Sequence, residues 1–185
     1  MLCAPRFSSH KRLPLLSDLF LDIQAEKPED DSAIERLSER TFGPGRFARS
    51  AYRLREEVDH RRDLSYTARI GTLLVGSVRL TPIKIGLAKA VLLGPLTVEP
   101  PFRSRGVGRA LMEASMAAAR KAGVRLILLV GDEPYYGRSG FRKVEKGRVK
   151  LPGPVDPDRV LIAELAERAF EGVSGDVRRD FSRPS

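Results

Sequence analysis

The stretch that most constrains the fold is a strand–turn–helix junction in the middle of the chain. Residues 91–98 form an apolar run typical of a strand, and Pro100 and Pro101 end it because proline cannot extend a hydrogen-bonded ladder. Glycine lets a backbone come close to a ligand, and the free N–H groups at a helix start favour an anion. The junction therefore predicts a site for a diphosphate group. A segment with helical periodicity opens there on Arg103, Ser104, Arg105, Gly106, Val107, Gly108 and Arg109.

Length and composition indicate one soluble globular domain of 185 residues, with 42% hydrophobic and 31% charged residues. A single cysteine, Cys3, excludes an internal disulfide framework and favours a reducing, cytoplasmic location. His10 and His60 stand far apart without a cysteine cluster, so we expect no zinc site and no other metal. No apolar run approaches the ~20 residues that a membrane span requires, and we expect no membrane partner.

Positive charge is concentrated around the junction. The formal net charge is +9, and residues 103–150 hold twelve lysines and arginines against four acidic residues. The commonest meaning of such a cluster is a solvated basic face. A second interpretation is a field that gathers a polyanionic ligand. Nucleic acid is a third, although no zinc-finger, RRM or basic-zipper pattern accompanies it.

Two helices are predicted before the junction and one after it. Ser32 and Glu35 have the spacing of a capping box at the start of a first helix. A second helix shows apolar residues at i, i+4, i+7 and i+11, and the helix after the junction is predicted to run to a stop at Gly123. The second helical face consists of Phe47, Ala51, Leu54 and Val58.

Seven strands are predicted, with a short helical turn at residues 134–139. The order of elements predicts an α/β fold, a central mixed sheet of about seven strands with helices on both faces. Residues 1–18 are predicted as a flexible leader, 19–172 as the single domain and 173–185 as a C-terminal tail. The predicted strands span residues 20–24, 66–70, 73–82, 91–98, 126–130, 141–144 and 159–165.

The junction resembles the R-x-x-G-x-G signature of the GNAT superfamily of N-acetyltransferases, since Arg103, Gly106 and Gly108 stand at its fixed positions. Tyr136, four residues before Gly140-Phe141, resembles that family's second marker, and residues 131–141 and 151–155 resemble its bacterial YhbS-like subgroup. The resemblance covers roughly residues 20–170. Two rival motifs fit less well. Leu111 replaces the third glycine of a dinucleotide fingerprint, and Arg109-Ala110 replaces the Lys-Ser/Thr of a P-loop.

The resemblance implies acetyl-CoA, or a related acyl-CoA, as donor. Its diphosphate would lie on the N–H groups of residues 105–109, with Arg103 and Ser104 beside them. Its pantetheine arm would pair as an added strand with Leu96 and Val98 across Thr97, and the Val98 N–H would polarise the thioester carbonyl. Many relatives carry a cofactor-contacting asparagine where this chain has Leu129.

Catalysis requires a neutral amine and a stabilised thiolate. The resemblance places Tyr136 as general acid or hydrogen-bond donor to the CoA sulfur. Glu99 is the acid nearest to the expected carbonyl site, and it is a candidate general base or a solvated strand-end residue. Three further acids, candidates to attract a cationic amine or simply solvated, are Glu56, Glu57 and Asp59.

The leading function is therefore an N-acetyltransferase that moves an acetyl group from acetyl-CoA to a primary amine by direct attack. An acyl-CoA-binding or regulatory module without turnover is one alternative. Acetylation of an RNA-linked amine, such as a charged tRNA, is another, since the surface is basic. The sequence leaves the acceptor and the oligomeric state open, a homodimer included.

Overall fold

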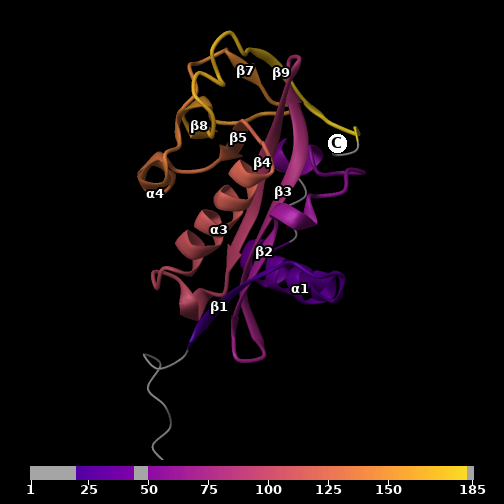
Figure 1. Ribbon diagram of the computed structural model, residues 1–185, viewed down its shortest axis with the longest axis vertical. Helices are drawn as coiled ribbons and strands as arrows, with labels where there is room; N and C mark the ends of the chain where they lie inside the picture. The colour runs from indigo at the N-terminus through magenta and orange to yellow at the C-terminus, as the bar shows by residue number, and fades with distance from the viewer. Residues whose placement is uncertain (1–19, 44–49, 183–185) are drawn as a thin grey trace, which may run out of the picture.

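The computed structural model describes residues 20–43 and 50–182, and it is built around one mixed β-sheet (Figure 1). Short 3-10 turns at residues 28–30, 62–64, 100–102, 137–139 and 157–159 join several of its elements. The helices are α1 (Asp31–Phe42), α2 (Ser50–Arg53), α3 (Val107–Lys121) and α4 (Glu133–Tyr136). The strands are β1 (Leu21–Ala25), β2 (Tyr66–Ile70), β3 (Leu73–Ile85), β4 (Ala88–Val98), β5 (Leu126–Val130), β6 (Arg142–Lys143), β7 (Val149–Lys150), β8 (Val160–Glu164) and β9 (Gly175–Arg179).

The main path of the sheet runs β1-β2-β3-β4-β5-β8-β6. Neighbours along this path are antiparallel except β4 and β5, which are parallel. β4 and β5 pair only through Val91 with Ile127 and Leu92 with Leu128. The sheet is therefore continuous at one end of these two strands and open at the other.

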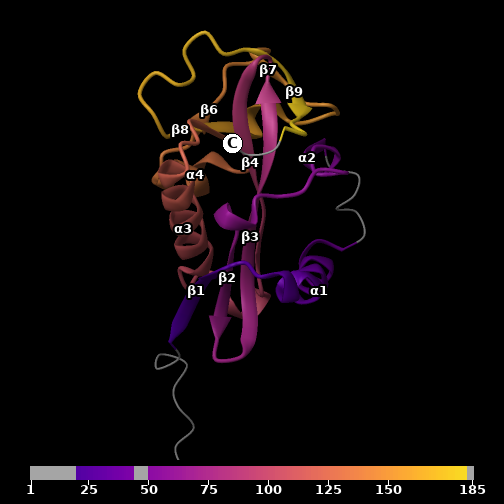
Figure 2. The same ribbon diagram turned by 45° about the vertical axis from the view of Figure 1, so that its right-hand side comes forward.

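Helices cover both faces of the sheet, as predicted. Figures 1 and 2 place α3 on one face and α1 and α2 on the other. The side chains of β5 point to both faces. Ile127 packs in the core under α3, while Leu126 and Leu128 pack in the core on the other face. This strand is buried on both faces, which explains its unbroken apolar sequence.

The structure corrects the expected start of the first helix. α1 begins at Asp31, so Ser32 lies inside it. A 3-10 turn comes first, and there the Asp30 side chain accepts a hydrogen bond from the Lys27 N–H at 3.0 Å. Pro28 favours this earlier start because its fixed φ suits the first turn of a helix. The capping-box role thus falls to Lys27 and Asp30.

The second helix is shorter than expected, since α2 ends at Arg53. Ala51 and Leu54 pack into the core as predicted, whereas Val58 lies beyond the helix. Phe47 and the predicted leader lie outside the described residues.

The tail prediction for residues 173–185 is wrong for the part that forms β9. This strand pairs antiparallel with β3 through residues 83–85, and parallel with β7. Its pattern is weak because only Val177 is buried. One inward side chain on a polar strand does not reveal a strand in the sequence. In the described part of the chain, no helix combines the length and apolarity needed to cross a membrane.

Candidate active site

The start of α3 offers a row of unpaired backbone donors. The first bond within the helix runs from the Ala110 N–H to the Gly106 carbonyl at 2.9 Å. The N–H groups of Gly106, Val107, Gly108 and Arg109 therefore have no partner within the helix. Gly106 caps it with a φ of 83°, a left-handed conformation that favours glycine. A Cβ on Gly106 would meet no atom within 4 Å, so space for a ligand lies in front of it.

The three arginines of the junction make different contacts. Arg103 donates from Nε to the Val98 carbonyl at 3.3 Å and so ties the turn to the end of β4. Arg109 pairs along the helix with Glu113 at 2.7 Å, with both side chains exposed. Arg105 is exposed and has no ion-pair partner among the residues that the structure describes. It is therefore the most available side chain for a phosphate.

The edge of β4 facing β5 is open beyond Leu92. On its other edge, the Glu99 N–H donates to the Val75 carbonyl at 2.9 Å, and the register then alternates residue by residue. In an antiparallel pair the bonded residues alternate with residues whose backbone groups point outward. The N–H and C=O groups of Leu96 and Val98 consequently point away from β3, and the Val98 carbonyl already accepts the bond from Arg103. Thr97 points its backbone to β3, and its side chain is fully buried.

A bulge interrupts β4 beside this edge. Val78 pairs with Leu96 and Leu80 with Leu93, so Gly94 and Pro95 stand opposite the single residue Arg79. A bulge redirects the strand and the side chains around it. Here it forms part of the wall of a cavity of about 680 Å³. The cavity lies between the α1–α2 region, β3, β4 and the segments that follow β5.

Tyr136 lines this cavity from α4. Its ring packs edge-on against Tyr135 at 4.8 Å and Phe141 at 6.0 Å between centroids. It also lies against Gly131, where any Cβ would collide with the ring. Burial raises the pKa of Tyr136 to about 12, with smaller contributions from Tyr135 and Asp132. The phenol is therefore a proton-bearing hydrogen-bond donor near neutral pH.

Glu99 directly follows β4 and precedes a 3-10 turn. Its carboxylate forms an ion pair with Arg40 of α1. Among the described residues that line the cavity, β4 contributes residues 93–96 and Glu99 is not included. The general-base role predicted for Glu99 stays a prediction without geometric support. Of the acids expected to attract the acceptor, Glu57 pairs with Arg179 at 3.1 Å, and none of the three lines the cavity.

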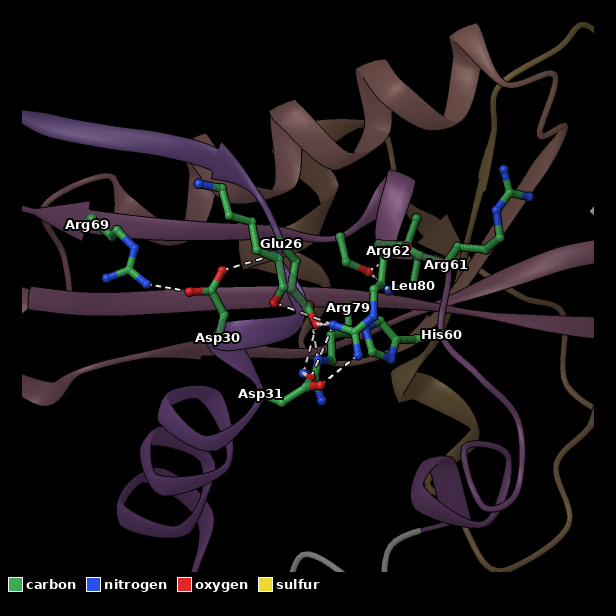
Figure 3. Close-up of polar contacts among 11 residues, drawn as sticks. Glu26, Asp30, Asp31, His60, Arg61, Arg62, Arg69, Arg79 and Leu80 are labelled. Carbon is green, nitrogen blue, oxygen red and sulfur yellow. Dashed lines mark hydrogen bonds and ion pairs between the residues drawn. The ribbon is translucent and has the colours of Figure 1, made fainter. Parts of the chain in front are cut away.

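A buried ionic network beside the cavity was not predicted from the sequence. Glu26 follows β1, and its side chain is fully buried. It accepts hydrogen bonds from Arg79 at 2.8 and 3.0 Å, from Arg62 at 3.0 Å and from His60 at 2.7 Å. Asp31 accepts bonds from the same two arginines (Figure 3). His60 and Arg79 also line the cavity, so the network reaches its wall.

This network contains a group of possible metal ligands. Ligand atoms of Glu26, Asp31 and His60 lie within 4.8 Å of one another. The two carboxylates, however, already receive charged donors from Arg62 and Arg79. A cation at this point would face two guanidinium groups, so the donor set favours an ion-pair network over a metal site.

Residues 62–143 match a family model described as an acetyltransferase (GNAT) domain. The chain contains a GNAT acetyltransferase domain. It is 26% identical over 155 residues to the uncharacterised N-acetyltransferase YhbS of Escherichia coli K12, covering 83% of this chain and 92% of YhbS. It is also 29% identical over 116 residues to the uncharacterised N-acetyltransferase YjhQ of that strain, covering 60% of this chain and 64% of YjhQ.

Two solved structures agree with this domain. The crystal structure of E. coli YhbS in complex with CoA superposes with a TM-score of 0.74 at 24% identity, over 92% of this chain and 94% of that one. A GNAT acetyltransferase from Brucella melitensis, in complex with acetyl-CoA, gives a TM-score of 0.56 at 26% identity, over 82% and 99%. The predicted GNAT fold, the YhbS-like resemblance and the N-acyltransferase class are confirmed.

Proposed function

We propose that this GNAT domain transfers an acetyl group from acetyl-CoA to a primary amine. The observation that carries the proposal is that the start of α3, the open edge of β4 and the cavity follow one another. Free N–H groups at the start of α3 suit the diphosphate, and the open edge of β4 suits the pantetheine arm. The cavity that holds Tyr136 lies at the end of this series. The CoA and acetyl-CoA bound by the two similar structures support the same donor here.

The donor would add to β4 as an extra strand. Leu96 presents its N–H and C=O groups, and Val98 its N–H, on the edge that β5 leaves open. Main-chain hydrogen bonds to an exposed sheet edge are a general mode of binding extended ligands. Of these two residues only Leu96 lines the cavity. We therefore place the thioester carbonyl at the Leu96 N–H, two residues before the Val98 N–H that the sequence predicts.

The cavity would hold the acceptor amine. Attack by the amine nitrogen forms the new N–C bond, and collapse of the tetrahedral intermediate breaks the C–S bond with its electrons on sulfur. Full proton transfer from a phenol of pKa about 12 to a thiolate of pKa about 8.5 costs about 5 kcal/mol. Tyr136 would therefore stabilise the leaving thiolate as a hydrogen-bond donor.

The donor site is tested by Gly106→Val. The variant is expected to raise the Kd for acetyl-CoA about tenfold or more, because the side chain enters the space before the helix. Isothermal titration calorimetry measures this change. Gly123→Val is the matched control, since Gly123 follows the same helix with a φ of 74° and equally open surroundings. It carries the same backbone strain far from the N-terminus. Equal Kd values in both variants would exclude a donor site at Gly106.

The raised pKa of Tyr136 predicts how kcat depends on pH. A group whose pKa is raised to about 12 keeps its proton throughout the alkaline working range. We expect no loss of kcat from deprotonation of Tyr136 between about pH 8 and about pH 10, where an unperturbed phenol begins to ionise. Thiol release from acetyl-CoA, followed across this range with a panel of primary amines, measures the profile and tests turnover itself.

A further inference from the structure

His60 belongs to a histidine–carboxylate pair at the wall of the acceptor cavity. Its ring lines the cavity, and its Nε2 lies 2.7 Å from Oε1 of the fully buried Glu26. Figure 3 shows the imidazole among the side chains of the ionic network. None of the sequence motifs involves this pair.

The bond to Glu26 determines which nitrogen of His60 is available. Burial acts to raise the pKa of Glu26, but hydrogen bonds from His60 and Arg79 outweigh it, and the pKa lies below its ordinary value. Glu26 is therefore an ionised group that only accepts hydrogen bonds. Nε2 must carry the proton of the neutral imidazole, which leaves Nδ1 as an acceptor. Within the described residues, Nδ1 has no hydrogen-bond partner.

Backbone contacts fix the position of His60 across from the bulge of β4. The next residue, Arg61, donates its N–H to the Leu80 carbonyl at 2.7 Å. The Ser65 hydroxyl donates to the Arg61 carbonyl at 2.7 Å and accepts from the Leu80 N–H at 3.1 Å. These hydrogen bonds hold the segment around His60 on β3 beside Arg79, the residue that faces Gly94 and Pro95.

Two carboxylates and the phenol of the cavity wall are less suited to accept a proton. Asp132 forms an ion pair with Arg159 at 3.1 Å. Asp156 accepts the Asp158 N–H at 3.0 Å and caps a short turn. Tyr136 already carries its proton. Imidazole is also the side chain that changes charge near neutral pH, where a general base works best.

We infer that His60 is the general base of the acetyl transfer and that Glu26 is its positioning residue; this inference rests on the proposed function. As the amine nitrogen bonds to the acetyl carbon, its proton passes to Nδ1 of His60. The C–S bond then breaks, and the thiolate leaves with the electron pair while Tyr136 donates a hydrogen bond to it.

Charged side chains from several elements surround His60. Glu26 and the two arginines of the network contact one another on one side, and the other charges stand along the cavity wall. A protonated imidazole cannot accept a proton, so the inference requires that the rate fall toward acid pH. The charged groups of the network around His60 are Glu26 after β1, Asp31 on α1, Arg62 in the 3-10 turn and Arg79 on β3, and those along the cavity wall are Glu35 on α1, Arg55 after α2, Asp132, Asp156 and Arg159.

The first test compares His60→Gln with His10→Gln, which changes the other histidine of the chain. Glutamine keeps an N–H for Glu26 but cannot act as a base. We expect His60→Gln to lower kcat about 10²-fold and to abolish the acid limb of the pH profile. The Kd for acetyl-CoA and the melting temperature should stay unchanged. Wild-type kcat with an intact acid limb in His60→Gln would overturn the inference.

The second test needs no acceptor. Long-range ¹H–¹⁵N correlation spectra of the full-length wild type report which imidazole nitrogen carries the proton, with His60→Gln used only to assign the signals. The Nε2–H form supports the inference, and the Nδ1–H form overturns it. Failure of every amine to react would overturn the proposed function, and the tautomer would still decide whether His60 presents a free Nδ1.

Discussion

Replacing Glu26 by alanine is expected to lower the free energy of unfolding by about 3–5 kcal/mol. The side chain is fully buried and balances the charges of Arg79 and Arg62, whose own side chains are 19% and 39% exposed. Without Glu26, the Arg79 guanidinium keeps only Asp31 as a charged partner among the residues that the structure describes. The cost arises from leaving buried charge uncompensated, not from the net strength of the ion pairs.

Urea denaturation measures this change, with Asp63→Ala as the matched control. Asp63 also accepts two bonds from an arginine, Arg61, but its side chain is 57% exposed. An exposed pair of this kind contributes about 0–1 kcal/mol. Equal losses in the two variants would contradict the structural role assigned to Glu26.

The Glu26 carboxylate also makes the free energy of unfolding depend on pH in the acid range. Its pKa is lowered in the folded protein, so the unfolded chain binds its proton more readily. The resulting stabilisation is present above the ordinary carboxyl pKa and is lost as pH falls through the lowered value. In Glu26→Gln this part of the acid destabilisation should be absent.

Tyr136→Phe is expected to lower kcat about 10²-fold while leaving the Kd for acetyl-CoA nearly unchanged. The phenol would donate a hydrogen bond that strengthens only as charge develops on sulfur, whereas its ring packing survives in phenylalanine. Single-turnover measurement of thiol release reports this step directly. An unchanged kcat would remove Tyr136 from the chemistry.

Tyr135→Phe provides the control for this prediction. Its hydroxyl lies against Gly108 at the start of α3, and Tyr135 is not among the described residues lining the cavity. Loss of this hydroxyl should leave kcat intact, and any effect should be confined to the affinity for acetyl-CoA. The two adjacent phenols thus separate the reaction step from donor binding.

Local signals in the sequence predict the strand-to-helix turn and the position of the tyrosine, while the donor-binding role of these residues stays a prediction. Gly106 and Gly108 mark a strand-to-helix turn, and Tyr136 stands at a fixed distance from Gly140-Phe141. Each of these features is complete within a few residues, so its geometry is encoded where it occurs. The helix-bounding residues around α3 were predicted for the same reason.

The ionic network beside the cavity could not be predicted in this way. Glu26, His60 and Arg79 come from three separate segments, and only the pairing of β1, β2 and β3 brings them together. Each is unremarkable in sequence, where an isolated charge most often indicates a solvated surface. Glu99 was chosen by its proximity along the chain, and its role as general base stays a prediction; in the fold its carboxylate pairs with Arg40 of α1.

β9 has a consequence for how the protein is made. Its pairing with β3 at residues 83–85 joins segments about ninety residues apart, so this contact forms late during synthesis. Until β9 leaves the ribosome, the distal edge of β3 carries unpaired backbone groups beside the apolar Ile83 and Ile85. Such an edge can pair with another chain. Once β9 has paired with residues 83–85, this edge of β3 is covered in the finished protein.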